Sequence, residues 1–541
     1  MFLLLSTVNA EFLTFVNSSI PNNLLWPKPR QYSFGTIDRT ISAVKFNSIG
    51  QNSDYFNRNA LRYTSLIFSE GCSKSTVTTD VNVCISQTDS DLFSDESYNL
   101  TIPSTGPILL YSQTGLGAKR GLETLAQLVV PTNPIPSFVM QSKSCDELAD
   151  SQFVIRNTPW NISDSPAIAH RGISLDTSRN YVTVADLYKI FDAMEAAKLN
   201  VFHWHIVDSH SFPLESKVVP LKSYSTYQTY SSDAVKNLTA YALDRGVRII
   251  PEFDMPGHTL SWSGLKDFIV CANKQPWSNY CAEPPCGQID ISNLQNLDII
   301  SKFIAEQSQS FTDSYMHFGH DEINMNCYQS ELKGDIETMI RTFTTKILSI
   351  AKNNNKTAIF WEDVLDHLDV KDGVIQVWKG SDSVSKLVGQ GLKVIASPAD
   401  HWYLDCGRGS MFGDNSWCDP YKTWKTVYNY RPSGVFGGEV ALWTEIVNSD
   451  VVSVLFPRTF AAAEVLWGTA GDWQEASYRL DKFSGFVGYR GINSGPVWPE
   501  FCKSGGCAQL KDTLPQTTAK NNETSYEFAI SILVAAILTL F

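Results

Sequence analysis

The sequence lacks the features of a nucleic-acid-binding protein. Its 541 residues include 43 Lys and Arg against 56 Asp and Glu, which gives a formal net charge of −13. No long basic run interrupts this acidic balance. Because nucleic-acid binding requires a cationic surface, the composition argues against nucleic acid as the main partner. The 14 Trp and 21 Tyr residues instead favour a packed globular protein with a neutral or cationic ligand.

The sequence also lacks an apolar run long enough to cross a bilayer comfortably. The tail at 528–541 has fourteen residues, is apolar apart from Ser531 and Thr539, and follows a polar stretch. This order is typical of a lipid-anchor attachment signal. We therefore expect 513–541 to be a polar spacer and apolar tail that attaches the protein to a membrane. The alternative is a C-terminal helix docked on the core.

A basic segment is missing at the N-terminus as well, but residues 1–10 are apolar and end in small residues, which predicts a signal peptide. Eleven Cys residues agree with an oxidising compartment. Sequons for N-glycosylation occur at Asn17, Asn99, Asn161, Asn237, Asn355 and Asn522. These features predict a glycosylated protein of the secretory pathway. They leave open a lysosome-like compartment, secretion or surface anchoring.

Two domains are expected, because 541 residues are too many for one core. Residues 20–150 are rich in strand patterns and contain a helix pattern at 117–128, which predicts a smaller α/β domain of sheet plus helix. Cys72 and Cys84 are close enough in this segment to form a disulfide. The helix carries two charged residues that we expect at the surface or between domains, Arg120 and Glu123.

Residues 165–500 alternate strand, loop and helix. Eight strand patterns occur, at 170–176, 200–208, 247–254, 314–323, 357–362, 374–378, 392–396 and 434–443. Parallel-type strands in this number, interleaved with helices, predict a closed (β/α)8 TIM barrel. The predicted fold is therefore α/β, with a barrel preceded by the smaller domain.

Two adjacent carboxylates, Asp321 and Glu322, end the fourth strand pattern. Side chains on a continuing strand point to opposite faces, so both reach one cavity only if the pleat breaks here. Parallel barrels build active sites at the C-terminal ends of their strands. Two such acids suit cleavage of a glycosidic bond, in which one group gives up a proton and another manages positive charge. An isolated pair would more simply be a solvated start of a loop.

The other strand ends carry further acids and tryptophans and one arginine. They are Arg171 with Asp176, Asp208, Glu252 with Asp254, Trp361 with Glu362, Trp378, and Trp443. Exposed Trp is unfavourable, whereas a Trp ring stacks well on the apolar face of a sugar. We expect Trp204 and Trp467 in the core. Together the strand ends predict a sugar pocket.

These residues lie in motifs that resemble glycoside hydrolase family 20, the β-N-acetylhexosaminidases of lysosomal type. The resemblance spans 26–498, and its motifs include 120–125, 170–172, 175–179, 251–258, 317–322, 402–405 and 438–445. It implies an exo-acting enzyme that removes terminal non-reducing GlcNAc or GalNAc from oligosaccharides or glycoconjugates. It also implies a homodimer that needs no cofactor and no metal.

The resemblance further implies a retaining, substrate-assisted mechanism. The sugar's own 2-acetamido oxygen attacks the anomeric carbon and gives an oxazolinium-type intermediate. Glu322 would act as general acid and then as base. Asp321 would orient the acetamido group and offset the charge on its nitrogen, while Tyr403 would donate a hydrogen bond to the acetamido oxygen.

Binding roles also follow from the resemblance. Arg171, aided by Asp208, would clamp the sugar hydroxyls, and Asp405 and Glu445 would accept hydrogen bonds from the distal hydroxyls. Trp361, Trp378 and Trp443 would form the walls and floor of the pocket. His258 matches a histidine near the acid. A structural histidine after a Pro-Gly turn is the alternative for His258. Three further histidines suggest a metal, but we expect them to pack and form hydrogen bonds: His203, His205 and His317.

The sequence departs from the family at His320, where glycine is usual, which predicts altered hydrogen bonding or an altered pH profile. The resemblance implies the disulfides Cys271–Cys327 and Cys502–Cys507. Proximity suggests Cys281–Cys286 and Cys406–Cys418, which leaves Cys145 unpaired.

Two competing interpretations remain. A sugar-binding barrel without activity would have no need for a proton donor, and a chitinase-type barrel would carry spaced rather than adjacent acids. The preference between GlcNAc and GalNAc and the natural substrate stay open.

Overall fold

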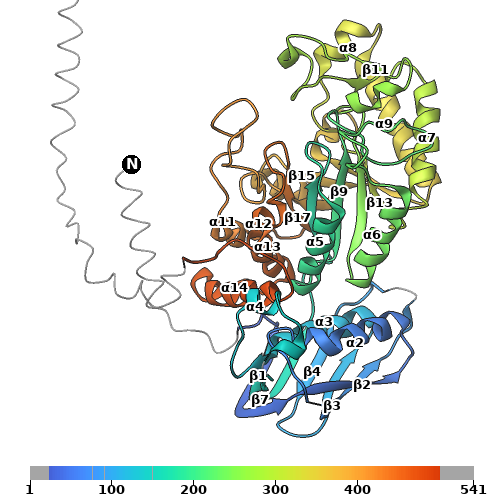
Figure 1. Cartoon of the computed structure of the whole chain (residues 1–541). Coiled ribbons are helices and arrows are strands. Elements are labelled where there is room, and N and C mark those ends of the chain that lie inside the picture. Colours follow the sequence, from blue (N-terminus) through green and yellow to red (C-terminus); the bar gives the residue numbers. More distant parts are fainter. Residues whose placement is uncertain (1–23, 76, 90–91, 149, 500–541) are drawn as a thin grey trace, which may run out of the picture. The chain divides into compact units, whose positions relative to one another are not determined.

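The computed structural model describes residues 24–499 apart from residues 76, 90, 91 and 149 (Figure 1). Several sequence predictions therefore lie outside the described residues: the signal peptide, the 513–541 tail, Asn17, Asn522 and the pair Cys502–Cys507. Within the described part, no helix is both long and apolar enough to span a membrane.

The N-terminal domain is a twisted sheet with two helices on one face (Figure 1). In spatial order its strands are β1 (Gln31–Ile41), β7 (Phe153–Asp164), β4 (Tyr98–Ile102), β5 (Ile108–Ser112), β3 (Thr78–Ile85) and β2 (Ala43–Gly50), and β6 (Val129–Pro131) pairs with β7. The helices are α2 (Asp54–Leu66) and α3 (Gly115–Leu128), of which α3 confirms the helix predicted at 117–128. Alternate strand residues such as Leu100 and Leu110 are buried beneath them.

The second domain is a closed barrel of eight parallel strands, as predicted. The strands are β8 (His170–Asp176), β9 (Val201–Val207), β10 (Arg248–Phe253), β13 (Tyr315–His317), β14 (Thr357–Trp361), β15 (Val374–Val377), β16 (Val394–Ala396) and β17 (Gly437–Leu442). Each lies within its predicted range. Closure places the C-terminal ends of all eight strands at one mouth of the barrel.

Helices connect and surround the barrel strands. They are α5 (Val184–Ala196), α6 (Ser232–Asp244), α7 (Gln295–Gln307), α8 (Met325–Glu331), α9 (Ile336–Asn353), α10 (Ser381–Gly389), α11 (Trp424–Asn429), α12 (Val451–Leu455), α13 (Arg458–Trp467) and α14 (Trp473–Gly488). Shorter elements are α4 (Ser137–Met140), β11 (Ile269–Val270), β12 (Gln288–Ile289), η2 (Cys145–Glu147), η3 (Leu260–Gly264), η4 (Trp277–Asn279) and η5 (Glu362–Asp366). Thr183 caps α5, since its hydroxyl accepts the N–H of Asp186 at 3.1 Å.

The barrel interior is apolar toward the N-terminal ends of the strands and polar above. The apolar layer consists of Val201, Ile250, Ile359, Val374 and Ile395. Above it, Glu252 and Glu439 are buried and hydrogen-bonded to histidines. Trp204 and Trp467 are fully buried, as expected.

Charged residues of α3 join the two domains. The Arg120 guanidinium donates to the backbone carbonyls of Leu199 and Gly246, both at 3.2 Å, and Glu123 accepts from Arg490 at 3.0 Å. Both α3 residues are fully buried. The expectation of interdomain charges is therefore correct for both Arg120 and Glu123, and neither residue is a surface charge.

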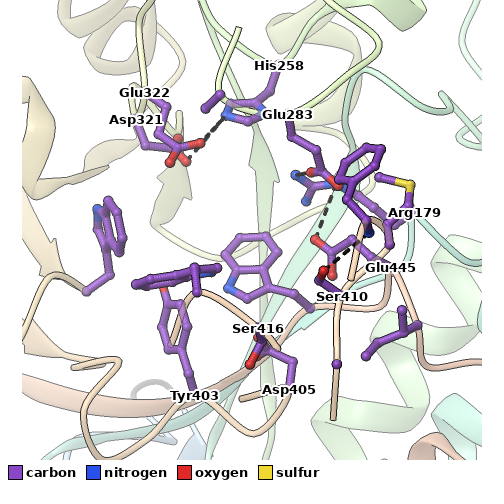
Figure 2. A pocket seen from close by; sticks show the side chains of 18 of the residues that line it. Arg179, His258, Glu283, Asp321, Glu322, Tyr403, Asp405, Ser410, Ser416 and Glu445 are labelled. Carbon is purple, nitrogen blue, oxygen red and sulfur yellow. Dashed lines mark hydrogen bonds and ion pairs between the residues drawn. The ribbon is translucent and has the colours of Figure 1, made fainter. Parts of the chain in front are cut away.

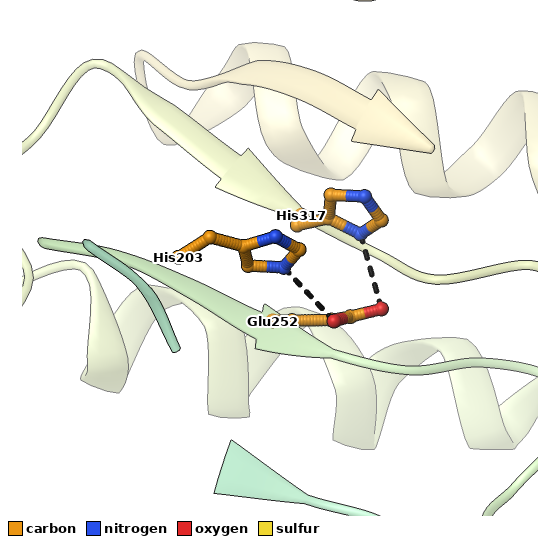
Figure 3. Close-up of side chains that lie close together, drawn as sticks. All are labelled: His203, Glu252 and His317. Atoms are coloured by element: carbon orange, nitrogen blue, oxygen red, sulfur yellow. Dashed lines mark hydrogen bonds and ion pairs between the residues drawn. The ribbon is translucent and has the colours of Figure 1, made fainter. Parts of the chain in front are cut away.

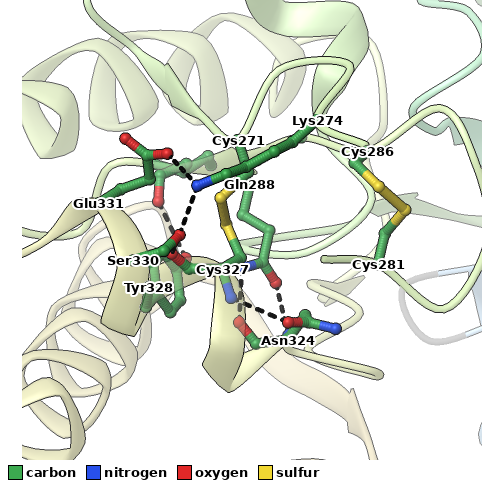
Figure 4. Close-up of a disulfide and its surroundings, with 12 residues drawn as sticks. Cys271, Lys274, Cys281, Cys286, Gln288, Asn324, Cys327, Tyr328, Ser330 and Glu331 are labelled. Carbon is green, nitrogen blue, oxygen red and sulfur yellow. Dashed lines mark hydrogen bonds and ion pairs between the residues drawn. A yellow bond between two sulfur atoms is a disulfide. The ribbon is translucent and has the colours of Figure 1, made fainter. Parts of the chain in front are cut away.

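One predicted disulfide is wrong. Cys72 pairs with Cys145, with a Cα–Cα distance of 5.5 Å, and Cys84 is a free thiol. Cys84 lies in β3 and points to one face of the sheet, whereas its buried neighbours Val83 and Ile85 point to the other. Short sequence separation could not reveal that orientation. The bond Cys271–Cys327 is confirmed, and Cys281–Cys286 also forms (Figure 4). Cys406–Cys418 forms as well.

Candidate active site

A pocket of about 460 Å³ opens at the C-terminal mouth of the barrel. Among the residues that line it are nine of the predicted site residues: Asp321, Glu322, Tyr403, His258, Trp361, Trp378, Asp405, Trp443 and Glu445. Figure 2 shows the acid pair beside His258, with Arg179 and Glu445 at another side of the cavity. The predicted convergence of strand ends on one cavity is therefore correct for these residues.

The backbone turns sharply where β13 ends. Gly319, His320 and Glu322 have φ angles of 61°, 80° and 51°, in the left-handed region. Only glycine fits at 319, because a Cβ there would overlap the Asp254 carboxylate. The same carboxylate accepts the His320 N–H at 3.0 Å and fixes the turn. The pleat thus breaks as predicted, and both Asp321 and Glu322 reach the pocket.

The His320 side chain points away from the pocket toward α9. Its Nε2 lies 2.5 Å from the Thr344 hydroxyl, and the residue is 1% exposed. Burial lowers the pKa of His320 to about 3. The imidazole therefore stays neutral at neutral pH, and it alters local hydrogen bonding rather than adding a titration near neutrality.

His258 connects the acid pair to a buried aspartate. Its Nε2 lies 3.3 Å from Glu322 Oε2 and 3.8 Å from Asp321 Oδ2, and its Nδ1 lies 3.5 Å from Asp208 Oδ2. Burial disfavours the charged imidazole, but the carboxylates of Asp208, Glu322 and Asp321 raise the pKa of His258 well above its usual value. His258 thus presents a positive charge to the acids.

The two adjacent acids experience different environments. Burial, helped by Glu252 and Glu322 and opposed by His258, raises the pKa of Asp321 to about 7. Burial acts on Glu322 in the same direction, but the hydrogen bond and charge of His258 outweigh it and lower the pKa of Glu322. Burial thus favours the protonated form of Asp321, whereas His258 favours the ionised form of Glu322.

Aromatic side chains form the walls of the pocket, and each is fixed from behind. Trp361 donates its indole N–H to Glu252 at 2.7 Å, and Trp378 donates to Asp363 at 2.7 Å. The Tyr403 and Trp443 rings meet edge to face, with centroids 6.2 Å apart. These contacts hold the flat rings in place before any ligand arrives.

Arg179 is a second positively charged side chain of the pocket. Its Nη2 lies 3.0 Å from Asp208 and 3.1 Å from Glu283, and its Nε lies 4.0 Å from Glu445. Its guanidinium also lies over the Trp443 ring at 5.2 Å. Nε and Nη1 are buried and make no hydrogen bond, and Nη1 lies 3.7 Å from Asp176.

Arg171 does not have the predicted role. It is the second residue of β8, at the end of the strand remote from the pocket, and it is fully buried. Its guanidinium donates to Glu96 at 2.7 Å and to the Lys198 carbonyl at 3.1 Å. Arg171 therefore joins the domains, and Arg179, three residues beyond the strand, occupies the pocket. The motif at 175–179 contained the signal for this assignment.

Two further residues need correction or addition. Asp208 is 1% exposed and does not line the pocket, so it supports Arg179 and His258 from behind. Glu283 lines the pocket beside Arg179 but was missed, because it lies in the Cys281–Cys286 loop and not at a strand end. The loop is fastened to the chain after Glu322, since Gln288 accepts the N–H of Asn324 at 2.7 Å (Figure 4).

The acids at the distal side are also perturbed. Burial raises the pKa of Asp405 to about 7. Burial, together with Asp176 and Glu283 and against Arg179, raises the pKa of Glu445 to about 8. Near neutral pH these carboxyl groups can donate as well as accept hydrogen bonds.

The predicted histidine cluster lies inside the barrel beneath the pocket (Figure 3). His203 Nε2 lies 2.9 Å from one oxygen of Glu252, and His317 Nδ1 lies 3.2 Å from the other. Burial opposes charge on His203, but Glu439 and Glu252 raise its pKa to about 9. Each Glu252 oxygen thus has an imidazole partner, and the hydrogen bonding expected from the sequence accounts for this grouping.

A closed parallel barrel with an acid pair, aromatic walls and an arginine at its mouth suits cleavage of a glycosidic bond. A family model described as glycosyl hydrolase family 20, catalytic domain, matches residues 168–470, and a second, described as beta-acetyl hexosaminidase like, matches 25–128. The chain belongs to glycosyl hydrolase family 20.

Similar proteins agree with this membership. A chitooligosaccharidolytic beta-N-acetylglucosaminidase of Ostrinia furnacalis is 31% identical over 540 residues, covering 88% of both chains. A beta-hexosaminidase of Emericella nidulans is 31% identical and covers 78% of this chain and 79% of its own. The structure of a Vibrio harveyi exo beta-N-acetylglucosaminidase in complex with N-acetylglucosamine has the same fold, with a TM-score of 0.72, 21% identity, and 89% and 80% coverage of this chain and its own. The protein is a glycoside hydrolase.

Proposed function

We propose that the protein is an exo-β-N-acetylhexosaminidase that removes terminal non-reducing GlcNAc or GalNAc by a retaining, substrate-assisted mechanism. The observation that carries the proposal is that Asp321 and Glu322, adjacent in the chain, line one cavity with contrasting pKa shifts. Adjacent acids suit a reaction in which one serves the leaving group and the other serves a nucleophile on the substrate. Curated relatives named as hexosaminidases support the same activity.

In the first step the 2-acetamido oxygen bonds to the anomeric carbon as the glycosidic bond breaks. Glu322 transfers its proton to the leaving oxygen, and Asp321 accepts the hydrogen bond of the acetamido N–H as positive charge develops. Tyr403 donates a hydrogen bond to the acetamido oxygen. Water then attacks the anomeric carbon from the vacated side, Glu322 takes its proton, and the acetamido group leaves, so the configuration is retained.

Substrate binding shifts the balance of protonation between the two acids toward Glu322. An acetamido N–H donated to Asp321 favours its ionised form and therefore lowers its pKa from about 7. Loss of that proton makes protonation of neighbouring Glu322 easier, because the two carboxylates repel one another. Binding of the N-acetyl group thus prepares the general acid.

The distal side of the pocket recognises the remaining hydroxyls. Arg179 provides a positive charge, and Glu445 and Asp405 line the pocket nearby as groups that can donate and accept hydrogen bonds. Glu283 adds a carboxylate on Arg179. A charged and hydrogen-bonding wall at this side suits a chain end and therefore exo-cleavage.

An inactive sugar-binding barrel is a weaker alternative. It would need the aromatic walls and Arg179, but it would gain nothing from an acid pair held by His258. A chitinase-type barrel with spaced acids is disfavoured by the adjacency of Asp321 and Glu322.

We also propose that the chain is exported, glycosylated and homodimeric. The disulfides Cys72–Cys145, Cys271–Cys327, Cys281–Cys286 and Cys406–Cys418 support folding in an oxidising compartment. The sequons at Asn99, Asn161, Asn237 and Asn355 are solvent-exposed. Membrane attachment through 513–541 and residence in a lysosome-like compartment, outside the cell or at its surface remain part of this proposal.

The test is hydrolysis of aryl β-glycosides of GlcNAc, GalNAc and glucose by the wild type and Glu322→Gln. Cleavage of the two N-acetyl sugars but not the glucoside is expected, with kcat of the variant lower by about 10²–10⁴-fold, as for loss of a general acid. Glu331→Gln is the matched control, because Glu331 is an acid on nearby α8 that pairs with Lys274 outside the pocket. Full turnover by Glu322→Gln would contradict the proposal.

A further inference from the structure

The outer face of the N-terminal sheet, opposite α2 and α3, carries two aligned rows of residues. The first row is Ile49, Cys84, Tyr111, Asn99, Ser163 and Gln31. The second is Asn47, Asn82, Leu109, Thr101, Asn161 and Ser33. Pairing partners in neighbouring strands lie about 5 Å apart, so each row is a continuous strip of side chains.

Part of this face is apolar and open to solvent. Ile49 is 52% exposed, Leu109 47% and Tyr111 46%. The half-buried Cys84 lies among them, and it is the one free cysteine of the described residues. A sheet face with apolar side chains and a free thiol invites association and oxidation, so it is normally covered or kept polar.

Two glycosylation sequons occupy the same strips. Asn99 and its hydroxyl residue Thr101 are in β4, and Asn161 and its hydroxyl residue Ser163 are in β7. Because the strands are antiparallel, Asn99 pairs with Ser163 and Asn161 pairs with Thr101. Asn99 also pairs with Tyr111 on its other side. Both acceptor amides are exposed and stand beside the apolar group.

We propose that N-linked glycans on Asn99 and Asn161 cover this face of the sheet and shield Tyr111, Leu109 and Cys84. The inference rests on the proposed export of the chain. In the modifying step the Asn amide nitrogen forms a bond to the reducing-end sugar of a lipid-linked oligosaccharide. The lipid diphosphate leaves, and the amide loses one proton. Because strand pairing would block access to the backbone, transfer precedes assembly of the sheet.

The proposed cover has a consequence for assembly. Bulky, solvated oligosaccharides rising from the centre of the face prevent flat docking of a second protein copy there. A homodimer would therefore use another surface. The pocket is lined only by residues of the barrel domain, so the cover has no direct contact with the chemistry.

The experiment uses the full chain produced in a glycosylating eukaryotic host. Glycopeptide mapping should find sugar on Asn99 and Asn161, and an endoglycosidase applied to the folded protein should increase the labelling rate of Cys84 by a thiol reagent severalfold. Thr101→Ala removes the Asn99 sequon and should reproduce the faster labelling, whereas Thr101→Ser keeps the sequon and should not. Asn237→Gln, which removes an exposed sequon on α6, is the matched control and should leave labelling unchanged.

The outcomes distinguish failure of the proposed glycan cover from failure of the proposed export. Sugar on Asn237 or Asn355 but not on Asn99 and Asn161 would overturn the cover and leave export intact. Occupied sites with unchanged Cys84 labelling after sugar removal would also overturn it. Absence of sugar from every sequon would contradict proposed export as well. The kcat/KM for an aryl N-acetylglucosaminide should be the same before and after sugar removal.

Discussion

The imidazole of His258 faces the carboxylate of Glu322, with 3.3 Å between Nε2 and Oε2. The two residues belong to loops after different strands, β10 and β13, and both have left-handed backbone angles, with φ of 53° and 51°. Such angles are costly for residues other than glycine, so the surrounding structure must hold them. The surrounding structure thus holds the charged imidazole of His258 in a fixed position beside the proton donor.

Replacing His258 should change the pH dependence of catalysis. His258→Gln removes the positive charge that holds the pKa of Glu322 low, so that pKa should rise. The general acid then stays protonated to higher pH, and the alkaline limb of kcat/KM should move to higher pH. The measurement is a pH profile on an aryl N-acetylglucosaminide, and an unchanged alkaline limb would contradict the role of His258.

Neutralising Asp321 should remove stabilisation of the charged intermediate. Asp321→Asn is expected to lower kcat by about 10²–10³-fold, the range for loss of one preorganised electrostatic partner. Asp267→Asn is the control, because Asp267 is a solvent-exposed acid that does not line the pocket. Equal kcat values for Asp321→Asn and wild type would exclude the assigned role.

The two arginines should respond differently to the same substitution. Arg179→Lys loses the planar donors that face the pocket, so kcat/KM should fall by at least about 10-fold, equivalent to about 1.4 kcal/mol, while the melting temperature changes less. Arg171→Lys breaks the buried bonds to Glu96 and Lys198 and should mainly lower the melting temperature. Steady-state kinetics and thermal unfolding of both variants decide the matter. A loss of kcat/KM in Arg171→Lys, with mainly a lower melting temperature in Arg179→Lys, would instead assign substrate binding to Arg171.

The buried acids should make stability depend on pH. Asp405 has a folded-state pKa of about 7, above its unfolded value of about 3.9, so folding favours its protonated form. Its contribution to the free energy of unfolding is full below pH 4 and is lost as the pH rises to about 7. Asp405→Asn should therefore show a smaller fall in melting temperature between pH 4.5 and 7.5, a range set by those two pKa values. Identical slopes for variant and wild type would be inconsistent with a buried, protonated Asp405.

The sequence predicted the parts of the structure that depend on local pattern. Apolar runs, most of them ending in acids or Trp, predicted all eight barrel strands, and the adjacency of Asp321 and Glu322 required the turn that the structure shows. The choice between Arg171 and Arg179 depended on which end of β8 faces the pocket. The direction of the strand indicates that Arg179 lies at the pocket end, but the resemblance implied the role of binding the sugar hydroxyls for Arg171 in the motif at 170–172.

Other features depended on contacts between distant segments. Cys72 pairs with Cys145, 73 residues away, and only the docking of those loops beside the sheet brings them together. Glu283 reaches Arg179 from a loop held by Cys281–Cys286 and Cys271–Cys327, without any strand pattern of its own. The support of Arg179 and His258 by Asp208 likewise appears only in three dimensions.

Participation of the substrate's acetamido group is tested most directly by weakening that nucleophile. Aryl N-acetylglucosaminides with one, two or three fluorines on the acetamido methyl group keep the leaving group constant while lowering the basicity of the attacking oxygen. The account predicts that kcat falls progressively with each fluorine in the wild-type protein. A kcat independent of fluorine content, with chemistry shown to limit turnover, would contradict it.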